Sequence, residues 1–169
     1  MEPIIVIVGF LGAGKTTLLK KLTKEYSNNS WNPFIILNDY ENASMDPQQF
    51  LDFLPPLQVN ALTGSCICCS GVHELRTRVN AIPTREKGIT FIEANGTTDA
   101  GELMGFLGVG IKEQFLPPIQ ISVVDVKNWQ NRGPHNELEA NQVQVSSIVL
   151  LNHLQDISLQ RIKEVKAIS

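Results

Sequence analysis

The segment 9–16 constrains the fold of this chain more than any other part of the sequence. It reads Gly-Phe-Leu-Gly-Ala-Gly-Lys-Thr, which matches the pattern G-x-x-x-x-G-K-[ST] in full. A β-branched apolar run, Ile4–Val8, precedes it, and a helix is predicted over 16–26. A glycine-rich turn between a buried strand and a helix is the setting in which this pattern holds phosphates. The segment therefore predicts a nucleotide site, with a chance match as the weaker alternative.

The loop residues have distinct roles in the predicted phosphate binding. Glycines let backbone N–H groups curl around the β-phosphate, and the helix adds the positive end of its dipole. Lys15 is expected to reach the β- and γ-phosphates, and the Thr16 hydroxyl is expected to bind Mg²⁺. The residues expected to hold the nucleotide here are Gly9, Gly12, Ala13, Gly14, Lys15, Thr16 and Thr17.

Apolar runs alternate with helix-like segments along the rest of the chain. They predict strands at 34–37, 89–92, 119–124 and 147–151, and helices at 47–53, 72–80, 100–106, 137–145 and 158–167. Such alternation is typical of an α/β fold. We expect a P-loop NTPase fold with a mostly parallel sheet and helices on both faces, in three layers. At 169 residues the chain suits one nucleotide-binding domain, residues 1–169.

Composition and charge argue against several classes of protein. Lys and Arg total 14 against 17 for Asp and Glu, a net charge of −3, and no basic stripe is present to bind a nucleic acid backbone. No apolar run approaches the ~20 residues that a membrane-spanning helix needs. The first apolar run also lacks the positive region of a secretory signal. We therefore expect a soluble, cytoplasmic protein that binds neither nucleic acid nor membrane.

All three cysteines of the chain, Cys66, Cys68 and Cys69, lie within four positions. The spacing C-x-C-C places three soft donors close enough to converge on one tetrahedral ion, for which Zn²⁺ or Cu(I) is best suited. Three protein ligands leave a fourth position open for exchange, to be filled by water, by His73 or by an acid from another loop. A small disulfide, or three buried core cysteines, remain as alternatives.

The phosphate loop, continued through Thr17 and Leu18, together with Cys66, Cys68 and Cys69, resembles the CobW-type GTPases, relatives of the UreG and HypB metallochaperones. The resemblance spans the whole chain, which corresponds to the N-terminal GTPase domain of that family without its C-terminal domain. It implies GTP hydrolysis with Mg²⁺, and the binding or delivery of zinc, cobalt or another transition metal to a client metalloprotein. The sequence leaves open whether the protein forms a homodimer.

Two further segments resemble the nucleotide-sensing switches of that family. Residues 38–46 resemble the first switch, in which Asp46 contacts Mg²⁺ or the hydrolytic water, although an Asp before Pro is also an ordinary helix N-cap. Residues 91–96 resemble the second switch. There Glu93 acts on Mg²⁺ through water or positions the hydrolytic water, and the Gly96 N–H meets the γ-phosphate. The alternative for Glu93 is a solvated acid at the end of a strand. The catalytic candidates are Lys15, Asp46 and Glu93.

The expected base-recognition motif is altered. GTP-specific P-loop proteins read guanine with Asn-Lys-x-Asp, but this chain has Asn-His-Leu-Gln at 152–155, followed by Asp156. Asn152 follows the last apolar run at the expected place. Gln155 offers one carbonyl acceptor, so base selectivity is expected to fall by about 1–3 kcal/mol. A one-residue shift that brings Asp156 into place is the alternative, and ATP therefore stays open beside GTP.

The sequence as a whole predicts a GTP-hydrolysing protein that couples its nucleotide state to metal binding at the C-x-C-C site. Two other functions remain open. One is a small-molecule kinase, which needs a mobile lid with arginines over the phosphates, and no such motif is recognisable. The other is a non-catalytic module that senses a nucleotide or a metal. Asp125, at the end of another predicted strand, also matches an Asp of the family, or simply caps the following turn.

Overall fold

The structure, a computed structural model, describes residues 1–38, 47–62 and 71–167. In these ranges one sheet of parallel strands has the order β3-β2-β4-β1-β5-β6. The strands are β1 (Ile4–Val8), β2 (Asn32–Asn38), β3 (Val59–Ala61), β4 (Gly88–Ala94), β5 (Ile119–Asp125) and β6 (Ile148–Asn152). The helices are α1 (Lys15–Asn28), α2 (Val72–Ala81), α3 (Ala100–Gly108), α4 (Asn136–Gln144) and α5 (Leu159–Lys166). None of the described helices has the length and apolar character that crossing a membrane requires.

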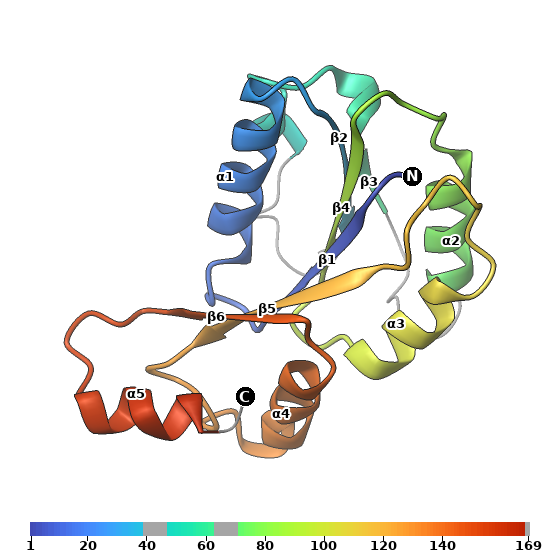
Figure 1. The fold of residues 1–169 in the computed structure, drawn as a ribbon. Coiled ribbons are helices and arrows are strands. Elements are labelled where there is room, and N and C mark those ends of the chain that lie inside the picture. Colours follow the sequence, from blue (N-terminus) through green and yellow to red (C-terminus); the bar gives the residue numbers. More distant parts are fainter. Residues whose placement is uncertain (39–46, 63–70, 168–169) are drawn as a thin grey trace.

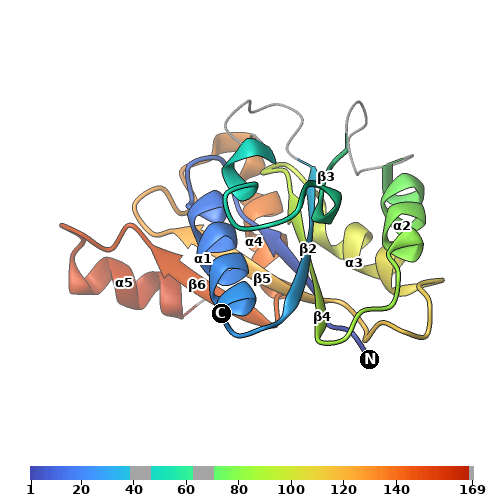
Figure 2. The same ribbon diagram turned by 90° about the horizontal axis from the view of Figure 1, so that it is seen from above.

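Helices cover both faces of the sheet, which confirms the predicted three-layer α/β fold (Figure 1). Figure 2 shows the sheet lying between α1 on one side and the pair of α2 and α3 on the other. Successive residues of a strand point to opposite faces, so Phe91 packs in the cluster of Leu19 from α1 while Ile92 packs in that of Leu75 from α2. A third cluster joins α4 and α5 to the β5 side of the sheet: Val124, Val126, Trp129, Val143 and Val165.

The central strand β1 determines where a ligand site can form. All of its residues are buried, as expected for a strand with a neighbour on each side and helices on each face. Ile7 pairs with Glu93 of β4 and with Ile121 of β5. The chain leaves β1 through α1 toward β2, whereas β4 connects through α3 to β5 on the other side of β1. Open α/β sheets bind ligands at such a reversal, beside the carboxyl ends of the strands.

The helix predicted over 47–53 is wrong in type. The segment forms a short 3₁₀ helix, Pro47–Phe50, followed by turns. Phe50 is fully buried, so the apolar pattern indicated burial correctly. The paired prolines at 55 and 56 disfavour an α-helical residue before them and leave too little chain for a longer helix. The sequence also missed β3, because its short run has no buried face to produce a pattern.

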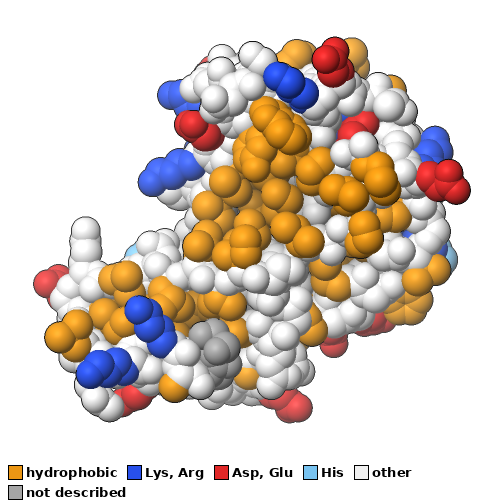
Figure 3. Space-filling view, viewed as in Figure 1, with side chains coloured by type: hydrophobic (Ala, Val, Ile, Leu, Met, Phe, Trp, Pro, Cys, Tyr) orange, Lys and Arg blue, Asp and Glu red, His pale blue; other side chains and the backbone are white. Residues whose placement is uncertain are grey.

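Part of the apolar surface stays uncovered. Figure 3 shows apolar side chains gathered over the middle of the face that Figure 1 presents. The strands β5 and β6 contribute exposed apolar residues, with Ile119 at 39%, Ile148 at 45% and Leu150 at 37% exposure. By exposure, the edge strand β6 and the first residue of β5 are less completely covered than the central strands β1 and β4.

A buried ion pair between Glu2 and Arg85 holds the amino-terminal edge of the sheet. Arg85 Nη2 lies 2.6 Å from Glu2 Oε2, and the two side chains are 7% and 5% exposed. The Arg85 backbone N–H donates to Glu2 Oε1 at 2.8 Å, and its Nη1 donates to the Asn32 carbonyl at 2.9 Å. The pair thus ties the segment before β1 to the loop before β4 and to the start of β2.

The variant Glu2→Ala is expected to lower the free energy of unfolding by about 3 kcal/mol, because the Arg85 guanidinium stays buried after its carboxylate is removed. Urea denaturation followed by circular dichroism measures the change. Glu74→Ala is the matched control, since Glu74 pairs with Arg78 at 3.5 Å on the exposed surface of α2. Its expected cost is below about 1 kcal/mol, and equal costs in the two variants would contradict the prediction.

Candidate functional site

The phosphate loop, residues 9–14, joins the carboxyl end of β1 to the first turn of α1 (Figure 1). Gly14, directly before the helix, has φ of 106°, a conformation that strains any residue with a side chain. A Cβ at this position would also collide with the side chain of Asn152. The predicted phosphate-binding residues all lie in this loop or in the first turn of α1: Gly9, Gly12, Ala13, Gly14, Lys15, Thr16 and Thr17.

Lys15 and Glu93 meet beside this loop. Lys15 is 6% exposed, and its Nζ folds back to donate to the Gly9 carbonyl at 2.6 Å. Glu93, near the carboxyl end of β4, is fully buried, and its Oε1 lies 3.8 Å from Lys15 Nζ. Burial contradicts the interpretation of Glu93 as a solvated acid. The arrangement places one cation and one carboxylate next to the loop where phosphates would be held.

The turn after β4 packs directly on the phosphate loop. A Cβ at Gly96 would lie 3.0 Å from the Leu11 nitrogen and 3.2 Å from the Phe10 Cα, so only glycine fits without displacing the loop. The turn is braced internally, because Thr98 Oγ1 donates to Asn95 Oδ1 at 2.7 Å. The structure therefore brings Gly96 to the loop, while its contact with a γ-phosphate stays a prediction.

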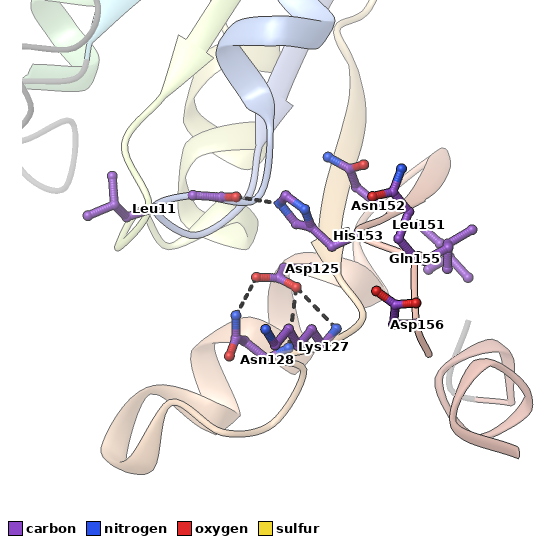
Figure 4. A pocket seen from close by; sticks show the side chains of 11 residues that line it. Leu11, Asp125, Lys127, Asn128, Leu151, Asn152, His153, Gln155 and Asp156 are labelled. Atoms are coloured by element: carbon purple, nitrogen blue, oxygen red, sulfur yellow. Dashed lines mark hydrogen bonds between the residues drawn. The ribbon is translucent and has the colours of Figure 1, made fainter. Parts of the chain in front are cut away.

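A pocket of about 740 Å³ opens beside the tip of the phosphate loop (Figure 4). One wall follows the end of β6, and the opposite wall is the turn after β5. Figure 4 shows polar groups from both walls around the pocket. Its lining residues are Leu11, Gly12, Asp125, Lys127, Asn128, Leu151, Asn152, His153, Leu154, Gln155 and Asp156.

Two consecutive residues at the end of β6 hold the phosphate loop by its carbonyls. Asn152 Nδ2 donates to the Ala13 carbonyl at 2.8 Å. His153 Nε2 lies 2.8 Å from the Gly12 carbonyl oxygen, which can only accept, so Nε2 carries the proton. The prediction that Asn152 lies at the nucleotide site is consistent with this placement. His153 contacts the loop although it stands where the motif has lysine.

Asp125 caps the turn that follows β5, as one of its two interpretations held. Its Oδ1 accepts from the Lys127 and Asn128 backbone N–H groups at 3.1 and 3.3 Å, and its Oδ2 accepts from Asn128 Nδ2 at 2.6 Å. These bonds shape the pocket wall opposite β6. Asp125 therefore stabilises this turn and also lines the pocket itself.

Several predicted site residues lie outside the described ranges: Asp46, Cys66, Cys68 and Cys69. In the parts of the chain that the structure describes, no three His, Cys, Asp or Glu side chains gather to form a metal site. His73, considered as a further donor, lies on the exposed surface of α2. The C-x-C-C metal site thus stays a prediction.

Arg132 packs against Phe10 of the phosphate loop and was not among the predicted site residues. Its guanidinium carbon lies 5.0 Å from the centre of the Phe10 ring. Its Nε donates to Glu139 Oε1 of α4 at 3.3 Å, and its Nη2 lies 3.9 Å from Asp125 Oδ2. No local pattern marks this arginine, because its partners come from three separate segments.

Comparison with known proteins decides the family. The sequence matches the profile of the CobW/HypB/UreG nucleotide-binding domain over residues 3–168. The chain belongs to this family. Among its relatives, the zinc chaperone YjiA of Escherichia coli K12 is 31% identical over 161 residues, covering 89% of this chain and 49% of that protein. Zinc-regulated GTPase metalloprotein activator 1 of Dictyostelium discoideum is 25% identical over 205 residues, covering 98% of this chain and 42% of that protein.

Solved structures show the same fold. The Zn(II)-bound YjiA GTPase from E. coli superposes with a TM-score of 0.60 at 19% identity, covering 99% of this chain and 54% of that one. The signal recognition particle receptor FtsY from Elizabethkingia anophelis, in complex with GDP, gives 0.56 at 15% identity, covering 96% and 52%. This CobW/HypB/UreG-family chain spans about half the length of the relatives it matches. The predicted family and fold are both confirmed.

Proposed function

We propose that this CobW/HypB/UreG-family domain binds and hydrolyses GTP with Mg²⁺ and couples its nucleotide state to the transfer of zinc to a client metalloprotein. The observation that carries the proposal is the contact of Lys15 with buried Glu93 beside the phosphate loop. The relatives support it, because one is named a zinc chaperone and another a zinc-regulated GTPase metalloprotein activator. Cobalt or another transition metal is the alternative cargo.

The residues beside the phosphate loop have different proposed roles in hydrolysis. Lys15 compensates the charge on the β- and γ-phosphates, and Glu93 orients the attacking water. The Thr16 hydroxyl would offer an oxygen donor of the kind that Mg²⁺ prefers. When bound, Mg²⁺ would supply electrostatic stabilisation of the charge that develops on the phosphates. Asp46 is proposed to contact the same ion or the attacking water.

The variant Glu93→Gln tests the proposed role of Glu93 in GTP hydrolysis. The amide keeps the size of the side chain but cannot attract a proton from water, so kcat for GTP is expected to fall about 100-fold or more. GTP affinity is expected to stay within about threefold, since the phosphate loop is unchanged. Phosphate release and nucleotide titration measure the two quantities.

Glu102→Gln is the control for that experiment, because Glu102 is an exposed acid in the first turn of α3. Equal rates in Glu93→Gln and the wild type would refute the role of Glu93. No phosphate release from wild type with either GTP or ATP would favour the non-catalytic sensing module instead.

The zinc part of the proposal depends on sequence order. Cys66, Cys68 and Cys69 follow the first switch and precede the second, so bound metal and the γ-phosphate would bias the same loops. Hydrolysis would then relax the switches and release metal to the client. Three thiolates with an open fourth position suit such exchange better than a closed site.

Replacing the three cysteines, Cys66→Ser, Cys68→Ser and Cys69→Ser together, is expected to lower zinc affinity at least about tenfold, because serine hydroxyls are poor zinc ligands. The same variant should lose the effect of zinc on GTP hydrolysis while keeping the basal rate. Zinc affinity is measured by competition with a chelator. Unchanged affinity in the triple variant would overturn the metal site.

The base is proposed to be read by Asp156. His153 and Asp156 have φ of 57° and 60°, so the chain after β6 turns through two left-handed residues. Both residues line the pocket, and Figure 4 shows the Asp156 carboxylate at its wall. A carboxylate accepts from both the N1–H and the N2–H of guanine, whereas the Gln155 amide offers one acceptor. A one-residue shift of the motif, which puts Asp156 in the place of its Asp, therefore supplies the two acceptors that guanine needs.

Asp156→Ala is expected to reduce the preference for GTP over ATP about tenfold, since it removes a charge-assisted pair of hydrogen bonds. Competition titrations against a fluorescent nucleotide measure the ratio of the two affinities. Gln155→Ala is the matched control in the same loop and should leave the ratio unchanged. The opposite result, with loss only in Gln155→Ala, would assign base recognition to Gln155.

The arginines argue against a small-molecule kinase. Each of the five in the chain bonds to the protein itself: Arg76, Arg78, Arg85, Arg132 and Arg161. A kinase lid needs arginines that are available to close over the phosphates. GTP hydrolysis therefore agrees better with the side chains than phosphoryl transfer to a small molecule.

A further inference from the structure

Buried polar side chains interrupt the core beneath α4. Gln120 and Ser122 lie in β5 and are 0% and 1% exposed, and Gln142 on α4 is 2% exposed. Strands of a parallel sheet covered on both faces are normally apolar at such positions. Because a buried polar group is costly unless it is hydrogen-bonded, a polar cluster in this place requires an explanation.

The cluster holds the last turn of α4 on the sheet. The Gln142 carbonyl accepts from Gln120 Nε2 at 2.7 Å, from Ser122 Oγ at 3.1 Å and from Ser146 Oγ at 2.7 Å. Carbonyls in the last turn of a helix lack partners within the helix. Two side chains of β5, together with Ser146, therefore supply these partners, and the β5 side chains fix where Gln142 lies relative to the strand.

The side chain of Gln142 reaches a different part of the site. Its Nε2 donates to the Gly96 carbonyl at 3.1 Å and to the Thr98 carbonyl at 3.0 Å. An amide nitrogen has two donors, so both are used on the turn 95–98. The same turn packs on the phosphate loop through Gly96, against Phe10 and Leu11. The turn is thus held between α4 and the phosphate loop.

We infer that Gln142 is a positioning residue that holds the turn 95–98 against the phosphate loop and so aims the Gly96 N–H at the γ-phosphate. The inference rests on the proposed function. Gln142 touches no phosphate itself and acts only through Gly96. On this proposal a nucleoside diphosphate does not need the turn 95–98, whereas a triphosphate also contacts it through the γ-phosphate. Gln142 therefore sets the preference for triphosphate over diphosphate.

The test variant is Gln142→Glu, which keeps the shape of the side chain but removes both donors from the two carbonyls. Affinities are measured with Mg²⁺ for fluorescent GDP and for a non-hydrolysable GTP analogue. The affinity for the analogue is expected to fall about tenfold, and that for GDP to stay within about twofold, as loss of one γ-phosphate contact predicts. In the same variant, the kcat for GTP hydrolysis is expected to fall together with the affinity for the GTP analogue. Gln144→Glu, exposed on the same helix, carries the same charge change and should alter neither affinity.

A second set of variants separates positioning from simple support of the fold. Gln142→Asn keeps the amide but withdraws it by one methylene, and is expected to give a smaller loss in the same direction. If Gln142→Glu does not fold, Ser122→Ala removes one donor from the Gln142 carbonyl and should again lower only the analogue affinity. Equal losses for both nucleotides, or an unchanged ratio, would overturn the inference. Failure of the wild type to bind GTP would instead overturn the proposed function.

Discussion

The parallel pairing of β1 with β4 on one side and β5 on the other is the constraint on which the site depends. Parallel strands bring their carboxyl ends to one edge of the sheet, so the phosphate loop after β1 and the acid of β4 meet there. The contact of Lys15 Nζ with Glu93 Oε1 at 3.8 Å follows from this pairing. A shift of β4 by one residue would turn Glu93 to the other face of the sheet and separate the two groups.

The phosphate loop is held from several directions. Asn152 and His153 bind its carbonyls from the end of β6, and Gly96 packs against it from the turn after β4. Glycines such as Gly14 adopt a positive φ without strain but lose much conformational freedom on ordering, and these contacts offset that cost. His153, which stands where the motif has lysine, bonds to the Gly12 carbonyl of the loop. This explains how the motif can depart from its usual pattern without losing the loop geometry.

Much of the fold and part of the site were predictable. Apolar runs and turn residues indicated the long strands and helices, and the phosphate loop with its context indicated where Lys15 would lie. Two polar residues within the apolar run of β5, Gln120 and Ser122, are a sequence signal of the buried polar cluster. Arg132 and Gln142 had no such signal, because each is defined by partners from distant segments. The helix expected over 47–53 failed because prolines at its end outweighed its apolar spacing.

The sequence by itself determined the phosphate loop, the alternation of strands and helices, and the membership of a family, since these depend on residues close together in the chain. Only the tertiary structure decided that Glu93 is buried beside Lys15 rather than solvated. It also decided that Asp125 caps a turn and that Gln142 joins α4 to the turn 95–98. The physical reason is that burial and hydrogen bonding between distant segments arise only when the sheet sets their register.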